Sequence, residues 1–187
     1  IAGKLKPDSV LLSIMAGIKM ATIEKEFGHN RIVRVMPNTP AAAKAGMSAW
    51  TCTSAVSASE RKLVSDLLGA IGRQIYFEDE KKLDMATAVS GSGPAYVFMF
   101  IEAMVEGAVA VGLPRAAAEE MVLQTLLGSA LYAQESGKSA GELRAMVTSP
   151  AGTTAAGLLE LEKGAFRASV IECVRAAHQR AIDLGNA

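Results

Sequence analysis

Strand-like segments stop at about residue 80, and every later segment with a regular apolar period is helical. Before that point, short apolar runs alternate with amphipathic helical stretches, an order that predicts a mainly parallel sheet. The expected fold class is therefore α/β followed by an all-α region, with domains at 1–79 and 80–187 joined at a charged connector. The expected strands are Val10–Ile14, Arg31–Met36, Met47–Thr53 and Gln74–Phe77, with helices at Met20–Phe27 and Ser59–Ile71.

One helix of the second region, Pro94–Val111, carries apolar side chains on nearly every side. Such a helix has to be covered all round. A second copy of the chain is a simple cover, because a helical domain of this size has little core of its own. We therefore expect a dimer interface here. The other expected helices are Pro114–Glu135, Ala140–Met146, Thr154–Glu162 and Phe166–Leu184.

The composition argues against several classes of partner. The 187 residues are 50% hydrophobic with a formal net charge of +0, which gives no reason to expect nucleic acid or a membrane surface. Glu102 and Glu106 interrupt the longest apolar run, so no membrane span is expected. Cys52 and Cys173 lack disulfide or zinc spacing, which favours a reducing cytoplasm and no metal. A small neutral metabolite is the expected partner.

The loop Met146–Thr154 contains proline, glycine and hydroxyl residues and leads directly into a helix. Free backbone N–H groups and the positive end of a helix dipole favour a bound carboxylate or phosphate. An ordinary capped helix start would give the same composition, since Ser and Thr are favoured N-caps. Taken alone, the loop leaves both interpretations open.

Two further corners lie at element ends: Arg34-Val-Met-Pro-Asn-Thr-Pro40 closes an expected strand, and Ser90-Gly-Ser-Gly-Pro-Ala-Tyr96 opens the long apolar helix. With Gly112-Leu-Pro-Arg115 and the Thr148-Ser-Pro150 loop they form an ordered set of four motifs. In this order they resemble the pyrroline-5-carboxylate reductase family, and the resemblance covers essentially all 187 residues.

The resemblance implies reduction of 1-pyrroline-5-carboxylate to L-proline, the last step of proline biosynthesis, with NADPH or NADH as donor. It implies a homodimer formed through the C-terminal helices, with a higher assembly of dimers left open. Thr154 is the implied catalytic hydroxyl. The expected substrate-binding residues are Ser149, Gly152, Thr153 and Thr154, and the expected cofactor-binding residues are Ala16, Gly17, Asn38 and Thr39.

The dinucleotide-binding glycine loop, Gly-x-Gly-x-x-Gly, does not occur in the 187 residues. The expected sheet therefore resembles the later half of a Rossmann domain, and the start at Ile1 rather than Met suggests an N-terminally truncated enzyme. We expect this chain alone to be inactive. A second departure is Ala151, which stands where members of the family usually have glycine and would strain the loop if the position requires positive φ.

Several other residues are interpreted as structural: the Glu102/Glu106 pair as a polar stripe, His29 and His178 as surface or helix-face residues, and Trp50 as packing. Two other functions remain open. One is another imine or hydroxyacid oxidoreductase with a Rossmann and a helical domain, although no lysine lies between Lys82 and Lys138 to serve its chemistry. The other is a non-catalytic helical dimerisation module.

Overall fold

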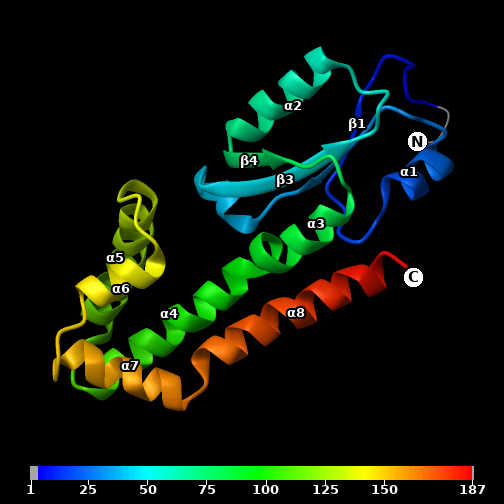
Figure 1. Cartoon of the computed structure of the whole chain (residues 1–187). Coiled ribbons are helices and arrows are strands. Elements are labelled where there is room, and N and C mark those ends of the chain that lie inside the picture. The colour runs from blue at the N-terminus through cyan, green and yellow to red at the C-terminus, as the bar shows by residue number, and fades with distance from the viewer. Residues whose placement is uncertain (1–3, 187) are drawn as a thin grey trace. The chain divides into compact units, whose positions relative to one another are not determined.

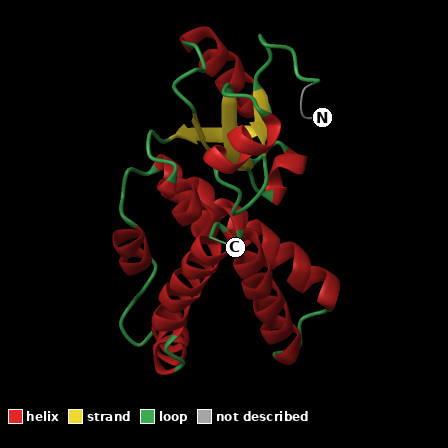
Figure 2. Cartoon of the chain, turned by 90° about the vertical axis from the view of Figure 1, so that its right-hand side faces the viewer, coloured by secondary structure: helices red, strands yellow, loops and turns green. Residues whose placement is uncertain are grey.

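The computed structural model of the chain describes residues 4–186, in two compact units. Of the described residues, one unit comprises 4–95 with 172–186, and the other comprises Tyr96–Ile171 (Figure 1). Ile1, on which the expectation of truncation rests, lies outside the described residues. All the strands of the described part belong to the first unit, and the second is built from helices and their connections (Figure 2).

The sheet of the first unit has four strands in sequence order: β1 (Leu11–Ser13), β2 (Ile32–Met36), β3 (Gly46–Cys52) and β4 (Gly72–Tyr76). The pairs β1–β2 and β3–β4 are parallel, and β2–β3 is antiparallel. The mainly parallel α/β sheet expected from the sequence is thus confirmed, with one antiparallel pair that was not expected.

Connection length explains the antiparallel pair. A parallel crossover needs about a dozen residues or more. The helices α1 (Met20–Phe27) and α2 (Ala58–Gly69) fill the two long connections, whereas only the short 3₁₀ helix η1 (Thr39–Ala43) separates β2 from β3. The chain must therefore reverse direction after β2.

A core of apolar side chains fills the space between the sheet and α2, which lies along one face of it (Figure 1). Trp50 at its centre is 3% exposed, stacks edge-on against Tyr76 with ring centroids 4.8 Å apart, and donates its indole N–H to Gln74. Its expected packing role is confirmed. The other buried members are Val33, Val35, Val56, Val64 and Leu68.

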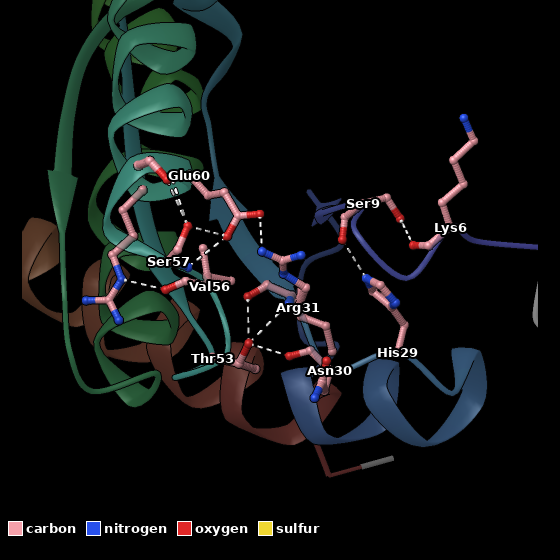
Figure 3. A network of polar contacts seen from close by, with 12 residues as sticks. Lys6, Ser9, His29, Asn30, Arg31, Thr53, Val56, Ser57 and Glu60 are labelled. Carbon is pink, nitrogen blue, oxygen red and sulfur yellow. Dashed lines mark hydrogen bonds and ion pairs between the residues drawn. The ribbon is translucent and has the colours of Figure 1, made fainter.

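Polar contacts tie the loops at one end of this unit together (Figure 3). Arg31 pairs with Glu60, which also accepts hydrogen bonds from the Ser57 hydroxyl and backbone N–H in a capping box at the start of α2. These hydrogen bonds from Ser57, aided by Arg31, lower the pKa of Glu60. His29 is 8% exposed, with Nε2 lying 2.8 Å from the Ser9 carbonyl oxygen. The expectation of a surface or helix-face histidine is therefore wrong for His29.

The long apolar helix is preceded by helical turns that were not expected. α3 (Lys81–Ala86), a π-helical turn (Thr87–Gly91) and α4 (Gly93–Ala110) follow one another with almost no break. The prediction that the motif Ser90–Tyr96 opens the helix is confirmed for α4, which begins at Gly93, although helical turns already precede the motif. The charged residues interpreted as a connector instead include the first turn of α3, where Leu83 is fully buried.

The second unit contains most of α4 together with α5 (Arg115–Glu135), α6 (Ala140–Met146), α7 (Thr153–Lys163) and the first residues of α8 (Phe166–Leu184). Val105 of α4 packs against Ala118 and Val122 of α5 to form its small core.

The apolar surface of α4 is mostly uncovered within the chain. Phe98 and Met99 are 54% and 74% exposed, although the sequence pattern requires cover on every side. By length and composition alone, the continuous helical stretch 81–110 is also long and apolar enough to cross a membrane, contrary to the expectation based on Glu102 and Glu106. Core helices of soluble proteins can have the same length and apolar composition.

Candidate functional site

The carboxyl ends of β1 and β2 lie at the same edge of the sheet, because these strands are parallel. Ligands of open α/β sheets bind beyond the carboxyl ends of the strands. Ala16 follows β1 and is exposed at this edge. Gly17 is buried, with φ +75°, and a Cβ there would lie 2.9 Å from the Cβ of Leu184 in α8. This corner therefore needs glycine both for its backbone and for its packing.

Asn38 and Thr39 follow β2 at the same edge. Thr39 is exposed and begins η1, whereas Asn38 is half-buried and its side-chain amide contacts the protein. Its Oδ1 accepts a hydrogen bond from the Met47 backbone N–H at 2.8 Å, and its Nδ2 donates to the Ser90 carbonyl oxygen and hydroxyl, each at 3.2 Å. The structure thus brings the four expected cofactor residues to one edge and adds Ser90 to them.

A buried ion cluster on one face of the sheet was missed by the sequence analysis. Arg34 of β2 is 3% exposed and donates to Glu80 Oε1 at 3.0 Å and to Asp84 Oδ1 at 3.1 Å. Glu80 Oε1 also accepts from the Met20 N–H at the start of α1. A charge inside the apolar run Ile32–Met36 was the available signal, since a buried arginine needs paired acids. This cluster anchors α3, and with it the π-helical turn, to the sheet.

The four expected substrate residues lie in the second unit, around the start of α7. Gly152 is the N-cap of α7, with no side-chain cap bond, and Thr153 and Thr154 are its first two residues. The first N–H groups of a helix have no partner within it. The N-cap interpretation of the hydroxyls is therefore wrong here, because the cap is glycine. A Cβ on Gly152 would collide with Ser149 Oγ, so glycine keeps this corner open.

Ala151 has φ +58°, a left-handed conformation that costs a residue with a Cβ about 1–2 kcal/mol. The condition for strain stated from the sequence is therefore met. The loop nevertheless closes, with the Gly152 N–H donating to the Ser149 carbonyl oxygen at 3.1 Å. Thr154 is half-buried, whereas Thr153 and Ser149 are exposed. Thr154 is thus the most sheltered hydroxyl of the three.

Other candidate groups have structural partners. Glu106 pairs with Arg115 at 2.8 Å across an exposed surface, and this hydrogen bond and charge raise the pKa of Arg115. His178 is half-buried beside Lys19, Lys81 and Asp84, in a cavity of about 350 Å³. Within residues 4–186 no cluster of three or more His, Cys, Asp or Glu side chains is arranged to hold a metal ion.

Comparisons with known proteins point to one family over nearly the whole chain. Residues 80–184 match the family model described as pyrroline-5-carboxylate reductase dimerisation. The pyrroline-5-carboxylate reductase of Pisum sativum is 46% identical over 97% of this chain and 67% of its own length, and that of Arabidopsis thaliana is 44% identical over 98% and 66%. A Plasmodium falciparum pyrroline carboxylate reductase solved with NADP bound aligns with a TM-score of 0.89 and 36% identity, over 95% of this chain and 71% of that one.

A mainly parallel four-stranded sheet followed by a region that matches a dimerisation family defines an α/β protein with an all-α second part. Within that class, the chain belongs to the pyrroline-5-carboxylate reductase family. It spans about two thirds of the length of the curated relatives named here.

Proposed function

We propose that this protein is an NAD(P)H-dependent pyrroline-5-carboxylate reductase, which converts 1-pyrroline-5-carboxylate to L-proline. The observation that carries the proposal is the uncapped start of α7, with Gly152 as N-cap and two threonines following it. In a member of this family, such a helix start suits an anionic imine substrate.

On the substrate side, the backbone N–H groups of Thr153 and Thr154 would bind the carboxylate, with Ser149 at the edge of the loop as a further ligand. The hydroxyl of Thr154 would donate to the ring nitrogen, whose basicity rises as the C=N bond is reduced. A donor held in place before the reaction stabilises that change without reorganisation. The half-buried position of Thr154 supports this role, because partial shelter from water strengthens a hydrogen bond.

On the cofactor side, Ala16, Gly17, Asn38 and Thr39 would line the nicotinamide half of NADPH or NADH. The exposed Ala16 beside the positive-φ Gly17 leaves room for close approach at the carboxyl end of β1. When bound, the cofactor supplies the hydride. The relative from Plasmodium falciparum, described with NADP bound, supports a nicotinamide cofactor without deciding between the two. The phosphate-binding motif Gly-x-Gly-x-x-Gly does not occur in the 187 residues. The four residues named above are therefore proposed for the nicotinamide half of the cofactor alone.

We further propose a homodimer through the helices of the domain 80–187, leaving higher assembly open, and a cytoplasmic location. The match to a dimerisation family supports the dimer, as do large exposed apolar side chains that need cover. On α5 they are Met121, Leu123, Leu127, Leu131 and Tyr132. The two cysteines are free, which suits a reducing compartment.

The test is a spectrophotometric assay of the protein as its gene encodes it, with 1-pyrroline-5-carboxylate and each cofactor in turn. Cofactor-dependent formation of proline is the expected result. Light scattering on the same sample should give at least a dimer, and Leu127→Asp should shift it toward monomer. A folded dimer that binds no cofactor and forms no proline would instead identify a non-catalytic dimerisation module.

A further inference from the structure

The side-chain amide of Asn38 forms hydrogen bonds with other groups of the protein. A backbone N–H can only donate, so the Met47 N–H at 2.8 Å identifies the facing atom as Oδ1. The two N–H groups of Nδ2 then face two acceptors, the carbonyl oxygen and the hydroxyl oxygen of Ser90. An amide nitrogen has two hydrogens, so Asn38 keeps no donor for a ligand.

The Ser90 carbonyl needs this donor because of Pro94. In a regular α-helix the carbonyl of residue 90 accepts from the N–H of residue 94, and proline has none. The chain forms a π-helical turn here, in which the Ser92 N–H bonds to the Thr87 carbonyl oxygen at 2.8 Å. Asn38 supplies the missing donor from the neighbouring corner. Single π turns inside helices are frequent at functional sites.

The π turn lies tightly against the end of β2. A Cβ on Gly91 would come within 2.7 Å of Met36 Cε, so the terminal methyl of Met36 lies close to the backbone of the turn. The turn is thus held to the ligand-binding edge of the sheet by Met36 through contact and by Asn38 through hydrogen bonds. Because the Ser90 oxygen already accepts from Asn38, its own hydrogen is directed to another acceptor.

We propose that Asn38 is a positioning residue: its amide fixes Ser90 so that the Ser90 hydroxyl donates to an acceptor on the nicotinamide half of the cofactor. The inference rests on the proposed function. It refines the role of Asn38 at the cofactor edge from direct contact to orientation of its neighbour.

The experiment is a double-mutant cycle of Asn38→Ala and Ser90→Ala in the protein as its gene encodes it. Isothermal titration would use NADPH and 2′-phospho-ADP-ribose, which lacks nicotinamide. Each single variant should bind NADPH about tenfold more weakly, the loss of roughly one hydrogen bond. Each should bind the fragment with unchanged affinity. The double variant should lose no more than the larger single loss, because both changes remove the same contact.

Thr87→Ala is the matched control, since its hydroxyl bonds to the Leu83 carbonyl oxygen within the same helical stretch. It should leave both affinities unchanged. If Asn38→Ala weakens the binding of both ligands equally, the role of Asn38 is purely structural. If the losses of the two single variants add up in the double variant, Asn38 and Ser90 make independent contacts. Either result overturns the inference. If the wild type binds NADPH but does not reduce the imine, the proposed function fails while the cycle still tests Asn38. If the wild type binds no NADPH, both proposals fail.

Discussion

Arg34 Nη2 and Asp84 Oδ1 lie 3.1 Å apart and join β2 to α3 through a guanidinium that is only 3% exposed. The contact determines where the helical stretch 81–110 begins relative to the sheet. The same guanidinium also pairs with Glu80, so Arg34 bridges two carboxylates.

Arg34→Met should therefore destabilise the fold strongly, because it leaves two acids in a partly buried site without their cation. We expect a loss of about 3 kcal/mol in the free energy of unfolding, the lower end for a broken buried pair, since Glu80 keeps some access to water. Urea denaturation measures it. Arg115→Met is the control on an exposed pair and should cost about 1 kcal/mol or less. Equal losses in the two variants would contradict this account of the buried cluster.

Gly17→Ala should destabilise more than Gly28→Ala. Both positions have positive φ, +75° and +62°, so both variants share the backbone cost of about 1–2 kcal/mol. At residue 17 the new methyl group also meets Leu184, whereas residue 28 has no atom within 4 Å of the added Cβ. Thermal unfolding of the two variants would detect the difference, and identical melting temperatures would show that α8 does not restrict this corner.

Ala151→Gly should relieve the left-handed strain of the substrate loop. The gain of about 1–2 kcal/mol is offset by about 0.5–1 kcal/mol of extra freedom in the unfolded chain, so stability should change little. In the protein as its gene encodes it, we expect KM for 1-pyrroline-5-carboxylate to fall, because the loop no longer opposes the bound conformation. Ala151→Val should raise it, since a β-branched residue tolerates positive φ poorly. Steady-state kinetics that ranked valine above glycine in substrate affinity would refute the strain argument.

In the protein as its gene encodes it, Thr154→Ala should lower kcat more than it raises KM. Its hydroxyl is proposed to donate to a nitrogen whose charge changes during the reaction, so the bond strengthens toward the transition state. The expected loss is about ten- to a thousandfold in kcat, the scale of removing one preorganised donor. Thr153→Ala, at the exposed neighbouring position, is the matched control and should change kcat little. The assignment fails if the two variants exchange these effects.

Glu60→Gln should flatten the acid limb of the stability curve. Hydrogen bonds from Ser57, aided by Arg31, lower the folded-state pKa of Glu60 below 4.5. A carboxylate with a lowered pKa stabilises the fold above its unfolded-state pKa, and this contribution disappears as the pH falls through its folded-state pKa. Denaturation at a series of pH values below about 5 tests this. Glu26→Gln, on an exposed position of α1, should leave the slope as in the wild type.

Local sequence signals were sufficient to predict most of the helices and strands. The helices Met20–Phe27, Ala140–Met146 and Phe166–Leu184 begin and end at the predicted residues, because caps, glycines and apolar spacing act within a few positions along the chain. The order of four motifs was enough to indicate the family. The exposed apolar surface of α4 likewise follows from a pattern visible in the sequence, although what covers it does not.

Tertiary structure decided the features that depend on distant contacts. The carbonyl that Pro94 leaves without a donor is local, but its partner Asn38 lies 52 residues from Ser90 along the chain. Similarly, an arginine within an apolar strand predicts acidic partners for Arg34. That these partners are Glu80 and Asp84 depends on how α3 packs on the sheet. Propensity and periodicity act over one or two helical turns, whereas a buried polar group is satisfied by whichever partner the fold brings to it.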